Sequence, residues 1–96
     1  MDQKPEQAKW LKTQADGTVE IDFTDCPIPM DGTEVKKLTM REPTVGDQLA
    51  VNGMATAPER EIAMIANLCE QAPDMLHKLT LRQYGRLQDA YASFID

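Results

Sequence analysis

The sequence lacks any apolar run that approaches the roughly 18 residues needed to cross a bilayer. Its first residues, MDQKPEQAKW, also lack the apolar segment of a secretory signal peptide. We therefore expect a protein of the cytoplasm without a membrane partner. The length of 96 residues suits one small domain with a single modest core.

Residue types that carry catalysis or bind metals are scarce. His77 is the single histidine, and no neighbouring residues complete a catalytic triad or a metal site. Cys26 and Cys69 are too far apart in the sequence for a close-spaced zinc or redox motif, so we expect free thiols. The five glycines are isolated and form no phosphate-binding loop. The sequence therefore predicts neither an enzyme nor a cofactor or metal site.

Positive charge is also limited. Ten Lys and Arg residues stand against sixteen Asp and Glu residues, which gives a formal net charge of −6. The largest basic cluster, Lys36, Lys37 and Arg41, has Glu34 and Glu42 as near neighbours. Nucleic-acid binding usually needs a basic stripe or patch, whereas an acidic surface suits a protein partner. We expect no nucleic-acid partner.

The clearest local signals lie in the first half of the chain. Residues 19–24 alternate apolar and polar side chains, which is typical of a half-buried strand. Asp31-Gly32 predicts a tight hairpin turn, because both central residues of such a turn need positive φ. Residues 33–40 then read as the returning strand. Its apolar positions change parity, which predicts an irregularity around Lys36-Lys37.

The second half has helical patterns over 44–53, 56–71 and 80–96, with a turn or short helical piece at 75–79. A threonine at the first position of each long pattern can cap the helix through its hydroxyl. Gly53 suits a left-handed cap at the end of the first helix. The sequence thus predicts an α+β fold, an N-terminal β-hairpin followed by about three α-helices in a single small domain.

The N-terminal segment has a different composition. Residues 1–16 are polar and poor in β-branched side chains, so we expect a flexible arm that precedes a folded domain over 17–96. Trp10, followed by Leu11, is the exception. Its ring could fold back onto the domain or anchor a partner.

The helix predicted at 56–71 carries more apolar surface than a small hairpin needs. One face holds Ile62, Ile65 and Cys69, and two further side chains widen the apolar arc to about 200° at about 100° per residue. Either the last helix or a partner covers this excess. The candidate partner-binding residues are Met64 and Leu68, together with Trp10.

Several phrases resemble the tail assembly chaperones of Mu-like contractile-tailed phages and their prophages. They are the Pro-Ile before Asp31-Gly32, the phrase VKKLTMREPT at 35–44, Gly46-Asp47 and the tail YASF at 91–94. The resemblance covers about residues 19–95, and LTMREP is its most specific part. Relatives tend to open the last helix with an acidic residue, where this chain has Arg82-Gln83.

The resemblance implies a non-catalytic role. Such proteins coat the long, helical tape measure protein in the host cytoplasm, keep it soluble before the tail tube polymerises, and are absent from the mature virion. Many are also made in a longer, frameshifted form, which is a second possible partner. The family implies no particular binding residue. An acidic adaptor with adaptable apolar side chains would mask the apolar stripes of a helical partner.

Two other functions fit the same sequence. One is a small phage-encoded transcriptional or anti-repressor-like regulator, whose helical half resembles a helix-turn-helix. Its last helix offers Arg82 and Arg86 as basic side chains, with Asp89 beside them. The other is a structural tail protein that stays in the particle.

Overall fold

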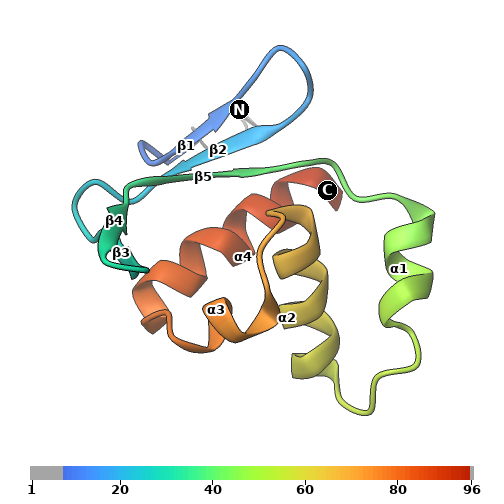
Figure 1. Ribbon diagram of the computed structural model, residues 1–96. Coiled ribbons are helices and arrows are strands. Elements are labelled where there is room, and N and C mark those ends of the chain that lie inside the picture. Colours follow the sequence, from blue (N-terminus) through green and yellow to red (C-terminus); the bar gives the residue numbers. More distant parts are fainter. Residues whose placement is uncertain (1–7, 96) are drawn as a thin grey trace, which may run out of the picture.

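Strands occupy the first half of the chain and helices the second, which confirms the predicted α+β fold. The computed structural model describes residues 8–95, and Figure 1 shows the strands lying along one side of the helices. The piece left open at 75–79 overlaps a short fourth helix that runs from Pro73 to His77. The elements are β1 (Leu11–Thr13), β2 (Val19–Asp22), β3 (Ile28–Met30), β4 (Thr33–Val35), β5 (Lys37–Met40), α1 (Val45–Val51), α2 (Ala57–Leu68), α3 (Pro73–His77) and α4 (Leu81–Ile95).

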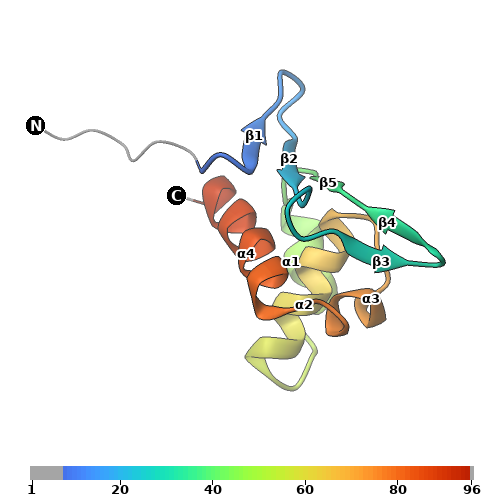
Figure 2. The same cartoon turned by 90° about the vertical axis from the view of Figure 1, so that its left-hand side faces the viewer.

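The strands form two antiparallel units. β1, β2 and β5 make a three-stranded sheet with β2 in the centre, and β3 and β4 make a ribbon that projects from it (Figure 2). Between the two units, residues 23–27 lie opposite Lys36 alone, and the Phe23 N–H donates to the Lys36 carbonyl at 2.6 Å. A bulge therefore interrupts one long hairpin, which confirms the predicted irregularity around Lys36-Lys37.

The turn of this hairpin lies where the sequence predicts it. Asp31 and Gly32 join β3 to β4 with φ angles of 50° and 81°. Positive φ at both central residues is the signature of a type I′ turn, whose twist matches that of the flanking strands.

The expectation of an arm over 1–16 is wrong for β1, while residues 1–7 lie outside the described residues. Leu11 pairs with Ile21, and its side chain is buried in the core. The connection to β2 is a turn in which Gly17 has a φ of 90° and the Thr18 N–H donates to the Asp16 carboxylate. A three-residue strand is too short to show a periodic pattern, and its burial comes from pairing with β2.

Threonine caps begin the three longer helices, as predicted. Thr44 and Asp47 form a reciprocal capping box at α1. The Thr56 hydroxyl accepts from the backbone of Glu59, and Thr80 and Gln83 cap α4 reciprocally.

The ends of α1 and α2 differ from the prediction. Gly53 does not adopt a positive φ, so the expected left-handed cap after α1 is wrong. α2 ends at Leu68 and not near Gln71, because Glu70 takes a φ of 57°. The N–H groups of Glu70 and Gln71 then donate back to the carbonyls of Asn67 and Ala66, which closes the helix.

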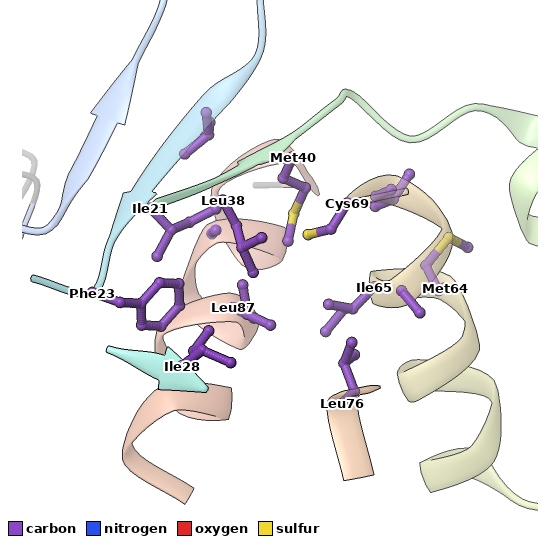
Figure 3. Packing of buried hydrophobic residues seen from close by; sticks show 14 of the residues in the cluster. Ile21, Phe23, Ile28, Leu38, Met40, Met64, Ile65, Cys69, Leu76 and Leu87 are labelled. Atoms are coloured by element: carbon purple, nitrogen blue, oxygen red, sulfur yellow. The ribbon is translucent and has the colours of Figure 1, made fainter. Parts of the chain in front are cut away.

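The core lies between the three-stranded sheet and the helices. Side chains from β2 and β5 point toward α2 and α4, and Ile65 and Leu87 meet them from the helical side (Figure 3). α2 is the central helix, since α1, α3 and α4 all contact it. The largest fully buried side chains are Phe23, Ile21, Met40, Ile65, Leu68, Leu87 and Val19.

Candidate functional site

Two of the three candidate partner-binding residues belong to the core. Leu68 is 1% exposed and Met64 is 6% exposed, so the expectation that they are free for a partner contact is wrong. The wide apolar arc of α2 is covered within the chain, because three helices and not one pack around it. The Leu68 carbonyl also accepts from the Arg41 N–H at 3.0 Å, which places the end of β5 over the end of α2.

The third candidate, Trp10, folds back onto the domain. Its ring lies over the guanidinium of Arg86, with 5.4 Å between the guanidinium carbon and the ring centroid. The same guanidinium is 5.9 Å from the ring of Phe23. Arg86 therefore lies within cation–π distance of two aromatic rings from the strand half of the chain. Binding of a partner by Trp10 stays a prediction.

Arg86 is also tied to the bulge between β2 and β3. Its two terminal nitrogens donate to the two carboxylate oxygens of Asp25 at 2.7 Å, and one of them donates to the Asp22 carbonyl. These hydrogen bonds lower the pKa of Asp25 to about 2. Arg86 is thus committed to holding α4 against the strands. In a regulator that bound DNA through α4, one of the two basic side chains of that helix would already be engaged in this ion pair.

Asp47 explains the arginine of the phrase LTMREP, because Arg41 donates hydrogen bonds to its carboxylate. The buried carboxylate of Asp47 accepts two hydrogen bonds from Arg41 at 2.7 Å, one from the Thr44 N–H and one from Asn67 of α2. The hydrogen bonds from Arg41 hold the pKa of Asp47 well below its usual range. We call these four residues the Asp47 network. It joins the end of β5 to α1 and to α2.

A groove opens on the other side of α1. It has a volume of about 570 Å³ and lies between α1, α2 and the last turn of α4. We call it the α1 groove. The lining residues that matter for its chemistry are Val45, Gln48, Asn52, Met64, Tyr91 and Ile95. Met64 is therefore part of the candidate site, although its side chain is nearly buried in the groove wall.

Exposed apolar side chains gather at this groove. Val45 is 75% exposed and Ile95 is 61% exposed, although both line it. Leu49, 68% exposed, follows Val45 by one helical turn on α1 and is not among the residues that line the groove. Leu81, 88% exposed, lies apart from them at the start of α4. The sequence carried no signal for this cluster, since Val45 and Leu49 fit the pattern of a buried helix face equally well.

The charged side chains of the groove wall already have partners. Arg60 donates to the Met54 carbonyl at 2.9 Å. The carboxylate of Glu61 accepts from the Tyr84 hydroxyl at 2.7 Å and from the Gln88 amide at 2.9 Å. The remaining polar groups, such as those of Gln48 and Asn52, are uncharged. This arrangement can accept apolar side chains and hydrogen-bonding groups.

The histidine and the cysteines considered in the sequence analysis lie outside the α1 groove. His77 is exposed at the end of α3, and burial raises the pKa of the Cys69 thiol to about 12. A thiol with that pKa is a poor nucleophile at neutral pH. Across residues 8–95, no three His, Cys, Asp or Glu side chains are placed to hold a metal ion. Over the same residues, no helix combines the length and the apolar character needed to cross a membrane.

Comparison with protein families identifies the chain. The family model described as "Phage tail assembly chaperone proteins, E, or 41 or 14" matches residues 20–96. The chain belongs to this family of phage tail assembly chaperones. The match confirms the resemblance carried by residues 19–95 and gives the chaperone a role in tail assembly. Neither the curated proteins nor the solved structures compared with it gave a match.

The matched region contains both structural features described above. It runs from β2 to α4, so it includes the Asp47 network and every residue of the α1 groove, and it leaves out β1. An assembly chaperone works by binding, so the family implies a role that is not enzymatic. The α1 groove is the candidate binding surface.

Proposed function

We propose that this chaperone binds the tape measure protein of a contractile phage or prophage tail and keeps it soluble until the tail tube assembles around it. The observation that carries the proposal is the α1 groove, lined by the exposed apolar side chains of Val45 and Ile95, in a member of a tail assembly chaperone family. The chaperone acts in the host cytoplasm, catalyses no reaction and leaves before the virion is complete.

The physical basis is the match between this surface and a long helical partner. A helix with an apolar stripe aggregates when the stripe faces water, and a groove that receives the stripe suppresses this. The chain adds a formal net charge of −6 to the complex, which favours solubility. A longer, frameshifted form of the same chain is a second proposed partner, and the nucleotide sequence downstream of Asp96 tests for it.

Co-expression tests the proposal directly. The tape measure protein encoded beside this chain is produced alone, with the chain, or with an unrelated small acidic protein, and its soluble fraction is measured. We expect it to be soluble and to co-purify only with the chain. An equal soluble fraction in all three cultures would contradict the proposal.

Analysis of purified virions distinguishes an assembly chaperone from a structural tail protein. Mass spectrometry of the particles should detect the tube and tape measure proteins and not this chain. Recovery of the chain in a fixed ratio to the tube protein would favour the structural role.

A further inference from the structure

We propose that the solvent-facing side of α4 pairs with the same side of α4 in a second copy of the chain, antiparallel and about a two-fold axis. The inference goes beyond the proposed function, because it concerns a part of α4 that does not line the α1 groove. It rests on an exposed apolar side chain beside a glycine, and on two exposed charges of opposite sign.

This side of α4 faces away from the core. Figure 2 shows α4 along one edge of the molecule, with no other described helix or strand beyond it. At about 100° per residue, Leu81, Arg82, Gly85 and Asp89 lie within about a third of the helix circumference. All of them except the half-buried Gly85 are exposed, and Leu81 is 88% exposed. We call these four residues the outer α4 face.

Gly85 leaves room for another helix to approach. It lines an open hollow of about 410 Å³ together with the other three residues of the outer α4 face. A Cβ atom added at Gly85 would meet no atom within 4 Å, so no contact among residues 8–95 requires a glycine here. Glycine inside a helix is unfavourable relative to residues with a side chain. Close approach by a helix from outside the chain gives this glycine a role.

The two charges of the outer α4 face have no partner within the described chain. Arg82 and Asp89 are seven positions apart, roughly 10 Å along the helix axis, so they do not pair with each other. Neither forms an ion pair within residues 8–95. Asp25 lines the same hollow, but its carboxylate oxygens accept hydrogen bonds from Arg86.

An antiparallel copy of α4 would satisfy both charges at once. With the two-fold axis between Gly85 and Arg86, position 82 of one helix lies opposite position 89 of the other. Arg82 of each copy then faces the partner's Asp89, which gives two equivalent ion pairs. Such self-complementarity is what a two-fold interface requires. These charges therefore favour a second copy of the chain as the occupant of this face.

The same register covers Leu81. Its side chain would lie against the partner's Gln88 and the partner's Ala92, both of which are exposed in the single chain. Because the interface is symmetric, two leucine side chains leave water in each dimer. The apolar contact supplies binding energy, and the ion pairs fix the direction and register of the helices.

The net charge sets the strength of the dimer. A formal charge of −6 on each copy opposes association at long range. At physiological salt the screening length is about 8 Å, so the contacts across the outer α4 face decide the outcome. Exposed ion pairs are individually weak. We therefore expect a reversible dimer with a Kd in the micromolar range.

Charge exchange tests the arrangement in the full chain. Sedimentation equilibrium of Arg82→Glu and of Asp89→Arg should each show a dimer weakened at least about tenfold, because like charges then face each other. An equimolar mixture of the two variants should dimerise again, since each copy then meets opposite charges at both positions. Asp74→Arg, the same change at an exposed position of α3, is the matched control and should dimerise as the unaltered chain does.

Gly85→Gln separates the interface from the fold. The added side chain has free space in the single chain and improves helix propensity, so the melting temperature of the monomer should not fall. The same side chain would hold two copies of α4 apart, and the dimer should weaken at least about tenfold. Undiminished dimerisation of this variant would overturn the inference.

The remaining outcomes are equally decisive. An unaltered chain that stays monomeric up to submillimolar concentration, or a mixture of charge variants that does not dimerise, would overturn the inference. A monomeric chain whose Gly85→Gln variant no longer co-purifies with the tape measure protein would overturn it in favour of that protein as the occupant. The proposed function fails separately: a chain that dimerises as described but does not solubilise the tape measure protein contradicts only the proposed function.

Discussion

The guanidinium of Arg41 and the carboxylate of Asp47 face each other with two N–O distances of 2.7 Å, six residues apart in the sequence. The turn between them contains Glu42 and Pro43, which end β5, and Thr44, which caps α1. Because Asn67 also donates to Asp47, the pair fixes α1 against α2 and thereby sets one wall of the α1 groove. The most specific phrase of the sequence thus has a structural role next to the candidate binding surface.

Replacing Asp47 with alanine should destabilise the chain. The substitution removes the helix cap and leaves Arg41 and Asn67 without their acceptor, at an expected cost of about 2–3 kcal/mol in the free energy of unfolding. Urea denaturation measures this. Asp74→Ala, in the first turn of α3, is the control. If both variants unfold at the same urea concentration, the Asp47 network does not support the fold.

Acid should destabilise the chain below about pH 4. The native pKa of Asp25 is about 2 and that of Asp47 is also depressed, whereas an unfolded aspartate has a pKa of about 3.9. A depressed native pKa contributes stability that is present above the unfolded pKa and is lost as the pH falls toward the native pKa. The urea midpoint should therefore decrease between about pH 4 and pH 2.

Asp25→Asn tests the assignment of this acid transition. The variant removes one of the titrating groups, so the slope of stability against pH should become smaller over the same interval. Glu34→Gln, on the exposed side of β4, serves as the comparison and should keep the slope of the unaltered chain. An unchanged slope in Asp25→Asn would assign the transition to other carboxylates.

Local signals predicted the elements that depend on neighbouring residues. Asp31-Gly32 forms the expected turn because its backbone preference is set within four residues, and the threonine caps act over three. The candidate site depends on distant residues and could not be predicted in this way. Leu68 is buried on a helix that three other helices contact, and Asn67 reaches Asp47 across twenty positions. No periodic pattern contains that information.

The exposed apolar residues illustrate the same limit. Leu81 and Ile95 continue the apolar stripe of α4, yet both are exposed because the stripe is longer than the surface it covers. Leu87, in the middle of that stripe, is fully buried. Periodicity indicates which face of a helix is apolar. It does not show how far along the helix the covering surface extends, and this extent decides where a partner can bind.

Leu11 should contribute to stability as a core residue. Leu11→Ala removes a buried side chain from β1 and should lower the free energy of unfolding by about 2 kcal/mol. Lys12→Ala changes the next, exposed residue of the same strand and is the control. Urea denaturation compares the two. Equal free energies of unfolding for the two variants would support the flexible arm expected from the sequence.

Trp10, the single tryptophan, reports on the Arg86 cluster. Arg86→Met removes the guanidinium over the ring and the ion pair that holds it, so Trp10 should become more accessible to water. We expect red-shifted emission and stronger quenching by acrylamide. Arg82→Met, an exposed arginine on the same helix, should leave both quantities unchanged. The same quenching in both variants would show that Arg86 does not hold Trp10 on the domain.

Leu68 and Leu49 should respond in opposite ways to the same substitution. Leu68→Glu places a carboxylate in the core beneath β5, and this should abolish the cooperative thermal transition seen by circular dichroism. Leu49→Glu makes the same chemical change on an exposed face of α1 and should leave the transition within a few degrees of the unaltered chain. A folded Leu68→Glu variant would show that this residue lies at the surface, as the sequence-based prediction of a partner contact requires. An unfolded Leu49→Glu variant would mean that this face of α1 is covered by the chain itself.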